Sequence, residues 1–480
     1  MKKEVLPSLS PLYTDMYQLT MAEGYFLCGK HRAPAVFDLY FRTNPFKGGY
    51  LVCTGMQEAA EILSGFHFSR SDLVYLKKNG FSPKFLEFLK SFRFHLNIDA
   101  VKDGEIVFPH EPLLRIEGTL LECQLAETLL INLIHFPSLV ATKASRMVRA
   151  AKGRSVIDFG LRRAQGTAGI LASRAAYVGG LEGTSNALAG KHFEIPVFGT
   201  QAHSWIQAFR DEELAFLAFA RIHQGETVLL IDTYDTLKSG LPNALKAMSK
   251  LGREGIRVRG LRIDSGDLAY LSKKVRESLD ASGYPEVKIF ASGQLDEYII
   301  ESLLLQGARI DSFGAGTKLV TSYDEPALDM VCKLSSVDGY PEIKISDSLI
   351  KMNEPGKKRI YRYIDQSGTF LLDALALADE KKITEVIHPV FELSRTNVKA
   401  MRFEEILFSL MRKGKAVREK QNAASAKKYA GERLKLLPEE HQRFYYPHIY
   451  RVGVSRKLFQ LKEKLIQKRL GINGRERGVL

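Results

Sequence analysis

Cysteine is scarce in this sequence, since the 480 residues contain only Cys28, Cys53, Cys123 and Cys332. These four lie far apart without a C-x-x-C pair, which excludes a disulfide framework and a zinc cage built from cysteine pairs. The G-x-S-x-G elbow of serine hydrolases and the H-E-x-x-H zinc motif are also absent. We therefore expect buried free thiols, no zinc centre and no serine-triad chemistry.

Long apolar runs are missing as well, because no stretch of about 18 uninterrupted apolar residues occurs. The mean hydropathy is -0.13. Residues 1–26 begin with basic side chains but have neither an apolar core nor a small-residue cleavage site, so we expect no signal peptide and a cytoplasmic protein without a membrane span. With 45% hydrophobic residues, the chain is too apolar for intrinsic disorder.

Positive charge is concentrated at the end of the chain. Residues 411–480 contain 19 Lys and Arg against 6 Asp and Glu, whereas the rest of the chain contains 50 against 49. This segment mixes basic residues with leucine at helical spacing, which is typical of a solvated helical face. The alternative is a surface that attracts phosphates or nucleic acid. No nucleic-acid-binding motif accompanies it, so we expect no nucleic-acid partner.

The chain divides into segments with different patterns. Residues 151–334 alternate short β-branched runs with helical stretches, which predicts a parallel α/β fold, and an irregular or closed (β/α) barrel is favoured over an open doubly wound sheet. Residues 1–150 predict an α+β sandwich domain, to which residues 335–410 return as antiparallel strands. Residues 411–480 form the basic, mostly helical extension.

Seven or eight βα-like units are expected between residues 154 and 334. The candidate strands are SVIDFG, YVGGLEG, IPVFGT, TVLLIDT, VRGLRID, VKIFASG, ARIDSFG and DMVCKLS. Ligands of such folds gather where the strands end, and these positions are polar here. They are Asp158, Arg162, Arg163, Thr184, Ser185, Asn186, Thr200, His203, Asp232, Thr233, Asp235, Arg262, Asp264, Ser265, Ser292, Gly293, Gly314, Gly316 and Thr317.

Two of these loops have the features that phosphate binding requires. Gly314 and Gly316 precede Thr317, and Ser292 with Gly293 precedes a helix start. Glycines allow the backbone to approach an anion, and the N–H groups of a helix start point toward it. A simple βα turn is the alternative for each loop. Two such loops on consecutive strands indicate a bound phosphate ester.

His203 follows the strand IPVFG, where it is either a structural hydrogen-bonding residue or a nucleophile. A long helix is predicted over 203–222, and its N-terminus would favour an anion and a neutral imidazole. Asp232, Asp235 and Asp264 either cap helices or, together with Arg262, hold Mg²⁺ and a diphosphate.

The sequence resembles the nicotinate phosphoribosyltransferase family along nearly its whole length. The matching stretches occur in order and are TDMYQLTMA, FDLYFRTNPF, DFGLRRAQG, GTSNALAG, GTQAHSW, LIDTYDT, LRIDSGDLA, FASGQLDE and FGAGTKLVT. The resemblance implies a type II phosphoribosyltransferase fold, in which an α/β sandwich packs on an irregular barrel, and a homodimer with shared active sites. It implies that nicotinate and 5-phosphoribosyl 1-diphosphate give nicotinate mononucleotide and diphosphate while ATP is hydrolysed, with Mg²⁺ accompanying the phosphates. A related enzyme acting on nicotinamide or quinolinate is the alternative.

The resemblance also implies roles for individual residues. Catalytic roles fall on His203, which ATP would phosphorylate, and on Arg262 and Asp264. The substrate-binding residues are Tyr17 and Phe159 on the two faces of the pyridine ring, Asp15 beside them, Arg162, Thr200 and Arg262 at nicotinate or the phosphoribosyl group, and Ser292, Gly293, Gly316 and Thr317 at the 5′-phosphate.

Overall fold

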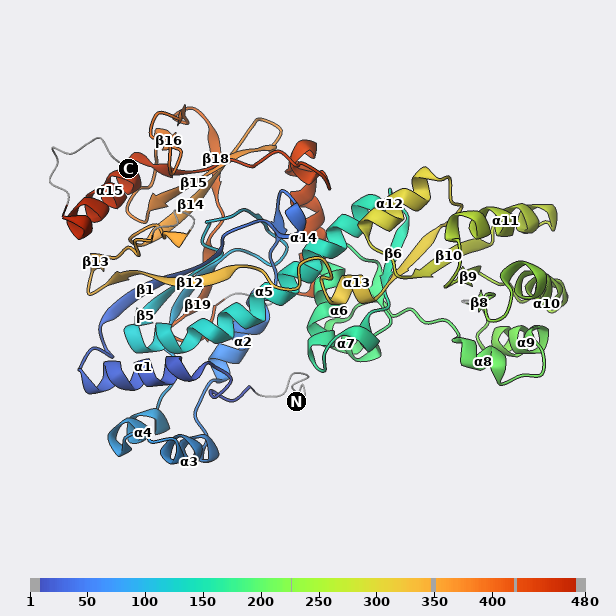
Figure 1. Cartoon of the computed structure of the whole chain (residues 1–480), viewed down its shortest axis with the longest axis horizontal. Helices are drawn as coiled ribbons and strands as arrows, with labels where there is room; N and C mark the ends of the chain where they lie inside the picture. Colours follow the sequence, from blue (N-terminus) through green and yellow to red (C-terminus); the bar gives the residue numbers. More distant parts are fainter. Residues whose placement is uncertain (1–8, 226, 347–350, 418–420, 472–480) are drawn as a thin grey trace. The chain divides into compact units, whose positions relative to one another are not determined.

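The computed structural model describes residues 9–225, 227–346, 351–417 and 421–471. Residues 1–8 of the N-terminal segment, and residues 418–420 and 472–480 of the predicted basic extension, lie outside this part of the chain. The chain divides into two compact units, one formed by residues 1–139 and 327–480 and the other by residues 140–326 (Figure 1). The predicted domain boundaries near residues 150, 335 and 410 stay a prediction.

The second unit contains a parallel sheet of six strands within the described residues, in the order β7-β6-β11-β10-β9-β8. Its strands are β6 (Ser155–Asp158), β7 (Gly183–Thr184), β8 (Val228–Leu230), β9 (Gly260–Ile263), β10 (Lys288–Gly293) and β11 (Ser312–Ala315). Helices follow these strands, namely α6 (Ala168–Val178), α7 (Ala187–Phe193), α8 (His203–Gln207), α9 (Glu212–Ile222), α10 (Leu241–Arg253), α11 (Leu268–Ala281), α12 (Glu297–Leu305) and α13 (Thr317–Val320), with short turns at η2 (Leu161–Arg163) and η3 (Thr236–Gly240).

Three of the candidate strands differ from the prediction. Tyr177 lies in α6, so the run YVGGLEG contributes only its end to β7. The run IPVFGT forms a single bridge between Val197 and Thr184. The run DMVCKLS is β12 (Met330–Val337), which pairs antiparallel with β1 (Pro34–Phe41) in the first unit. Apolar β-branched runs mark strands but do not select their partners, which depend on tertiary packing.

The first unit is built around two larger sheets within the described residues. One has the order β13-β12-β1-β5-β3-β19-β20 and the other β17-β16-β21-β15-β14-β18, with a small pair β2-β4. The strands not yet given are β2 (Leu51–Val52), β3 (Asn97–Ala100), β4 (Ile106–Val107), β5 (Leu114–Thr119), β13 (Tyr340–Pro341), β14 (Lys358–Ile364), β15 (Phe370–Leu377), β16 (Glu385–Ile387), β17 (Arg395–Asn397), β18 (Arg402–Glu405), β19 (Phe408–Arg412), β20 (Lys415–Ala416) and β21 (Val452–Ser455).

Helices of the first unit come from both ends of the chain. They are α1 (Met16–Leu27), α2 (Met56–Gly65), α3 (Arg70–Lys78), α4 (Pro83–Lys90), the first part of α5 (Leu120–Ala150), α14 (Ala423–Leu436) and α15 (Arg456–Leu470), with short turns at η1 (Pro45–Lys47) and η5 (Glu439–Gln442). A turn at Asp338 and Gly339 joins β12 and β13, and both residues have positive φ angles, of 51° and 79°. Such angles are those of a two-residue hairpin turn.

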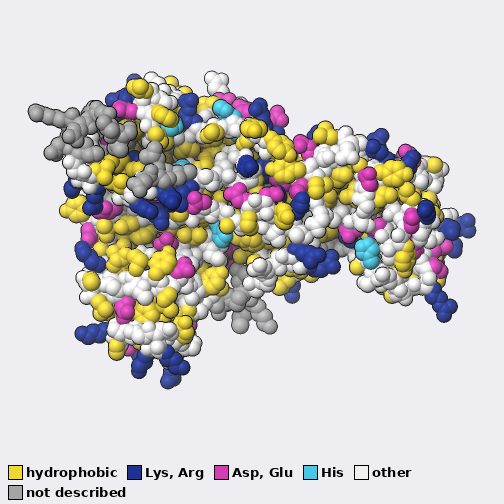
Figure 2. Space-filling model, viewed as in Figure 1, with side chains coloured by type: hydrophobic (Ala, Val, Ile, Leu, Met, Phe, Trp, Pro, Cys, Tyr) yellow, Lys and Arg dark blue, Asp and Glu magenta, His cyan; other side chains and the backbone are white. Residues whose placement is uncertain are grey.

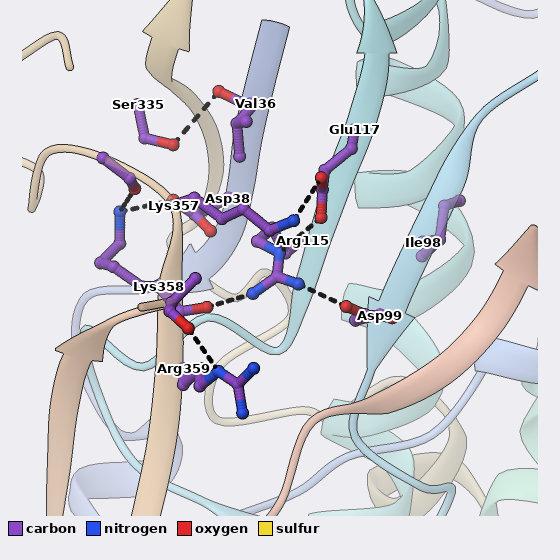
Figure 3. A network of polar contacts seen from close by, with 12 residues as sticks. Val36, Asp38, Ile98, Asp99, Arg115, Glu117, Ser335, Lys357, Lys358 and Arg359 are labelled. Atoms are coloured by element: carbon purple, nitrogen blue, oxygen red, sulfur yellow. Dashed lines mark hydrogen bonds and ion pairs between the residues drawn. The ribbon is translucent and has the colours of Figure 1, made fainter. Parts of the chain in front are cut away.

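A buried polar network joins the two larger sheets of the first unit (Figure 3). Arg115 on β5 donates from Nε to Glu117 at 3.1 Å, and its other nitrogens donate to Asp99 and to the carbonyl oxygen of Lys358 on β14. The Lys358 Nζ lies 2.7 Å from the Asp38 carboxylate on β1. Because buried charges are tolerated only when they are paired and hydrogen-bonded, this network fixes how β14 meets β1 and β5.

The basic residues near the C-terminus pair with carboxylates of the first unit. Arg433 on α14 is buried, and its Nε donates to Glu105 at 2.8 Å. Further pairs join Lys462 to Glu354, Arg469 to Glu342, Arg456 to Glu385 and Lys457 to Asp379. Basic and acidic side chains are also interspersed over the face shown in Figure 2. The charge of α14 and α15 is therefore used in part to attach both helices to the rest of their unit.

The expectation of buried free thiols is wrong for Cys28, which is exposed, whereas Cys53, Cys123 and Cys332 are buried as expected.

Within the described residues, α5 is long and apolar enough to cross a membrane by length and composition, and 67% of its most apolar window is buried. Such burial is typical of the core helix of a globular protein.

Candidate active site

Arg262 connects the ends of β9 and β10 with the loop that carries Thr200. Its side chain leaves β9 and donates from Nε to Ser292 Oγ at 2.8 Å, from Nη1 to Thr200 Oγ1 at 2.8 Å and from Nη2 to Asp264 Oδ1 at 2.7 Å. The Ser292 hydroxyl also donates to Asp264. We call Arg262, Thr200, Asp264 and Ser292 the arginine cluster. Residues that are up to 92 positions apart in the sequence thus share one planar, permanently charged group.

Asp264 is ionised in this cluster. Its partial burial opposes ionisation, but the hydrogen bond from Ser292 and the charge of Arg262 hold the pKa of the carboxyl below its usual value. The side chain of Asp264 is 31% exposed. A cation and an anion are therefore fixed side by side at the open end of the sheet.

Phe159 lies directly after β6, next to the arginine cluster. The Arg262 guanidinium carbon lies 5.3 Å from the centre of the Phe159 ring, a distance at which a cation is attracted to an aromatic face. A Cβ on Gly314 of β11 would lie only 2.4 Å from this ring. Gly314 thus has a packing role, because a side chain there would displace Phe159.

Asp158 fixes the loop that carries Phe159. Its side chain is buried, and it accepts hydrogen bonds from the Gly160 N–H at 2.8 Å, from Ser173 Oγ at 2.8 Å and from Thr184 Oγ1 at 2.6 Å. These donors lie in the β6 loop, in α6 and at the end of β7. The sequence placed Asp158 at a strand end but did not reveal this anchoring function.

His203 faces Asp232 across the same end of the sheet. Its Nε2 lies 3.3 Å from Asp232 Oδ1, and the imidazole is 42% exposed while the Asp232 side chain is 1% exposed. The other oxygen of Asp232 accepts from the Asp264 N–H at 2.8 Å and from Ser265 Oγ at 2.7 Å. Asp232 therefore links His203 to the loop after β9, which contains Asp264 and Ser265.

The expected long helix after His203 is interrupted. The structure has α8 over five residues and α9 from Glu212, with Asp211 capping α9 through the Leu214 N–H at 2.8 Å. The competing N-cap splits the apolar pattern into two helices. A five-residue helix has a much smaller dipole than the predicted one, so Asp232, rather than a long helix, dominates the surroundings of His203.

Two of the carboxylates that the sequence predicts as possible Mg²⁺ ligands, Asp232 and Asp235, already contact protein groups. Asp235 caps η3 by accepting from the N–H groups of Leu237 and Lys238 at 3.0 and 2.8 Å. Both oxygens of Asp232 face protein partners. Among the described residues, no group of three or more His, Cys, Asp or Glu side chains is arranged to hold a metal ion.

The two glycine-rich loops lie next to each other. Gly293 ends β10 and pairs with Ala315 of β11, directly before Gly316 and Thr317. Gly293 has a φ of 117°, and a Cβ there would lie 2.9 Å from the Asp264 carbonyl oxygen. Only glycine fits this position. The predicted phosphate loops thus occupy adjacent strand ends, beside the arginine cluster.

The remaining predicted residues lie outside these contacts. Arg162 lies in η2 and is exposed, without a hydrogen bond or ion pair to another described residue. Asp15 and Tyr17 belong to the first unit, at the start of α1. Asp15 accepts from Thr128 Oγ1 at 3.1 Å, and Tyr17 is 52% exposed with its hydroxyl accepting from Gln18.

Comparisons with known proteins identify the family of this chain. Three family models match the chain: the nicotinate phosphoribosyltransferase N-terminal domain over residues 12–135, the nicotinate phosphoribosyltransferase family over residues 154–393 and the nicotinate phosphoribosyltransferase C-terminal domain over residues 357–462. The nicotinate phosphoribosyltransferase of Bacillus subtilis is 42% identical over 471 residues, with 95% of each chain covered. That of Caenorhabditis elegans is 36% identical and covers 95% of this chain and 93% of its own.

Solved structures of nicotinate phosphoribosyltransferase and of a related enzyme are also similar to this chain. The crystal structure of human nicotinic acid phosphoribosyltransferase is 29% identical and superposes with a TM-score of 0.85 over 94% of this chain and 99% of its own. A nicotinate-nucleotide pyrophosphorylase from Pyrococcus furiosus is 25% identical, with a TM-score of 0.71 over 91% of this chain and 99% of its own. The predicted fold class is confirmed.

The chain belongs to the nicotinate phosphoribosyltransferase family. It is an enzyme that transfers a phosphoribosyl group to nicotinate, as the sequence predicted.

Proposed function

We propose that the second unit carries the chemistry of an ATP-coupled synthesis of nicotinate mononucleotide from nicotinate and 5-phosphoribosyl 1-diphosphate. The arginine cluster is the observation that carries this proposal. Its fixed cation suits a departing diphosphate, and the ionised Asp264 suits the positive charge that develops at the ribose carbon. We also propose that the enzyme acts in the cytoplasm.

The substrates are held by the groups around this cluster. Nicotinate stacks on Phe159, and Thr200, Arg162 and Arg262 contact its carboxylate or the phosphoribosyl group. The 5′-phosphate binds the adjacent loops through backbone N–H groups, assisted by side-chain hydroxyls. These loop residues are Ser292, Gly293, Gly316 and Thr317.

Bond formation at the ribose requires no general base. The ring nitrogen of nicotinate is unprotonated at neutral pH, so its lone pair attacks C1 directly while the C1–diphosphate bond breaks. Arg262 stabilises the negative charge of the leaving group. The reaction is thus driven by orientation and electrostatics, which the rigid hydrogen bonds of the arginine cluster supply.

Magnesium fits this site as a companion of the phosphates. Asp264 uses one oxygen for Arg262 and Ser292, which leaves the other to face the ion. Mg²⁺ retains waters and often takes only one or two carboxylates beside substrate phosphates, which agrees with so few available carboxylate oxygens. When bound, it would neutralise phosphate charge.

His203 is the acceptor of phosphate from ATP. Since Nε2 faces Asp232, the tautomer with hydrogen on Nε2 is favoured, which leaves the lone pair on Nδ1. Nδ1 attacks the terminal phosphorus, ADP departs, and Asp232 compensates the positive charge of the ring. Water later cleaves the phosphorus–nitrogen bond and releases phosphate.

We further propose a homodimer in which Tyr17 and Asp15 complete the site of the partner. In support, α1 exposes large apolar side chains on one stripe, namely Met16, Tyr17 and Met21, and Tyr13 is exposed in the turn before this helix. Such a stripe marks a protein interface more often than a free surface. Closed dimers repeat one contact twice, so each chain would lend Tyr17 and receive it.

A heterodimer tests this sharing. One chain carries both Tyr17→Ala and His203→Ala, and its partner is wild type. If sites are shared, one site lacks Tyr17 and the other lacks His203, so little coupled activity is expected. Near-half coupled activity in purified, non-exchanging heterodimers would show that each chain uses its own Tyr17.

The reaction itself is tested with purified protein. We expect nicotinate mononucleotide to form from nicotinate, phosphoribosyl diphosphate and Mg²⁺, and ATP to raise its yield while it is hydrolysed. Nicotinamide and quinolinate serve as matched alternative bases. Equal turnover of either one would contradict the assignment of nicotinate as the substrate.

A further inference from the structure

The two phosphate loops leave the sheet on neighbouring strands. The first, residues 292–296, joins the end of β10 to α12, and the second, residues 314–317, joins the end of β11 to α13 (Figure 1). The pairing of β10 with β11 ends at Gly293 and Ala315, so the sheet does not hold the loops together beyond this point. Two loops that bind one phosphate must nevertheless keep their spacing to within about 0.5 Å.

An ion pair joins the two loops beyond the last paired residues. The Lys318 ammonium group contacts Oδ2 of Asp296. Lys318 directly follows Thr317 of the second loop, and Asp296 ends the first loop. The Asp296 side chain is 5% exposed and that of Lys318 is 20% exposed. The pair is therefore largely shielded from water, where opposite charges attract each other more strongly than at an open surface.

Asp296 has a second contact, which differs in kind from the ion pair. Its Oδ1 accepts from the Ile299 N–H at 2.7 Å and so caps the start of α12. A helix cap needs only one oxygen, and asparagine supplies it as well as aspartate does. The cap and the ion pair with Lys318 can therefore be separated by a single substitution.

The start of α12 is fixed by the long helix α5. Glu297 follows Asp296 and is fully buried, and its two oxygens face two cations of α5. Arg146 Nε donates to Oε1 at 2.7 Å, and Lys143 Nζ lies 2.8 Å from Oε2. Paired charges that are buried on all sides leave little freedom to move. Asp296 is thus held on a rigid support.

The second loop has less support of its own. Helix α13 has only four residues, and its N-cap, Gly316, has no side chain with which to cap it. So short a helix is not stable by itself. Lys318 attaches its start to Asp296, and Asp324, in the turn after α13, pairs with Lys143 of α5. Ion pairs to α12 and α5 therefore determine where α13 lies.

We propose that Asp296 and Lys318 are positioning residues, which hold the two phosphate loops at the spacing that the 5′-phosphate requires. This inference rests on the proposed binding of the 5′-phosphate to these loops. Lys318 acts through Asp296 and is not itself a phosphate ligand, because its charge is already compensated by a shielded carboxylate. Its Nζ also lies 5.6 Å from the centre of the Tyr323 ring, a second contact that holds the side chain in place.

Calorimetric titration of the full chain with ribose 5-phosphate tests the proposal, because this probe carries the 5′-phosphate without the diphosphate. Asp296→Asn keeps the cap and removes the ion pair, and we expect it to weaken binding about tenfold. Lys318→Met should have the same effect. The double variant should also lose about tenfold and not a hundredfold, since the second substitution has no pair left to break. The affinity for magnesium diphosphate should stay within twofold in all three.

Kinetics and two controls complete the test. The KM for phosphoribosyl diphosphate should rise about tenfold in Asp296→Asn, while the KM for nicotinate stays within twofold. Lys318→Arg keeps the charge and should bind ribose 5-phosphate within threefold of wild type. Lys274→Met on α11, which breaks an exposed ion pair with Glu277, is the matched control and should change nothing.

Three results would overturn the proposal. Unchanged affinity for ribose 5-phosphate in Asp296→Asn would show that the ion pair does not position the loops. Tighter binding in this variant would show that Lys318, once released, is a phosphate ligand. A hundredfold loss in the double variant would show that the two residues act independently. Asp296→Asn and the double variant leave no unpaired buried charge, so the test stands even if Lys318→Met fails to fold.

Thr317→Ala separates this inference from the proposed function. If it weakens ribose 5-phosphate while Asp296→Asn does not, the loops bind the phosphate and only the positioning role is refuted. If Thr317→Ala leaves the affinity unchanged, the placement of the 5′-phosphate at Thr317 is contradicted, and the positioning role with it.

Discussion

Replacing Asp158 with asparagine is expected to raise the KM for nicotinate about tenfold to thirtyfold. The carboxylate accepts three hydrogen bonds, from Gly160, Ser173 and Thr184. The amide nitrogen of asparagine cannot accept, so at least one buried donor loses its acceptor, at a cost of about 1–3 kcal/mol. If about 1.4–2 kcal/mol of this cost falls on the conformation that presents Phe159, the competent loop becomes correspondingly rarer and the apparent affinity decreases tenfold to thirtyfold.

Steady-state kinetics checks this prediction, with nicotinate varied at saturating phosphoribosyl diphosphate and then the reverse. The KM for nicotinate should increase more than that for phosphoribosyl diphosphate, since Phe159 lies on the loop that Asp158 holds. Ser173→Ala is the matched control, because it removes one donor while Gly160 and Thr184 keep the carboxylate, and an effect below about threefold is expected. A KM for nicotinate within twofold of wild type in Asp158→Asn would refute the reasoning.

Three further substitutions test other parts of the structure. Arg262→Lys replaces a planar fork, which donates from three nitrogens, with one ammonium nitrogen that cannot reproduce all three hydrogen bonds, so kcat/KM should fall about thirtyfold; a fall below threefold would show that Arg262 is not a direct ligand. His203→Ala should abolish labelling by ATP but leave slow, uncoupled synthesis, whereas acid-labile, base-stable phosphate on the variant would contradict the assignment. Arg433→Met should lower the free energy of unfolding by about 3 kcal/mol, since Glu105 loses a buried partner; urea denaturation measures this, with Lys428→Ala on the same helix as the control and an unchanged midpoint as the contrary result.

Much of the site could be predicted from the sequence because strand ends are recognisable locally. Asp264 directly follows β9, Arg262 and Ser292 lie near the ends of β9 and β10, and parallel strands bring such positions to one edge. Gly293 was also predictable, since a positive φ angle selects glycine within a loop. The structure brings all four together.

Other features depend on contacts that local sequence does not encode. The break between α8 and α9 follows from a cap at Asp211 that competes with a continuous apolar stripe. The strand β12 has the composition of a barrel strand, yet it pairs with β1, more than 280 residues away. The ion pairs of Arg433 and Lys462 require partners on β-strands and loops of the first unit, so charge counting alone described that segment as a solvated face.

The carboxylates at the strand ends form two groups, which differ in exposure and in the number of hydrogen bonds that they accept from the protein. The side chains of Asp158 and Asp232 are 1% exposed, and nearly all of their oxygens face protein donors. Asp264 is 31% exposed and directs one oxygen away from its protein partners. A buried carboxylate that accepts several hydrogen bonds orients its neighbours, whereas a partly exposed one next to a cation is free to meet a substrate. The residues that the sequence presents as equivalent are thus separated by packing: Asp158 and Asp232 contact the groups that hold Phe159 and His203, and we propose that Asp264 is the carboxylate that takes part in the reaction.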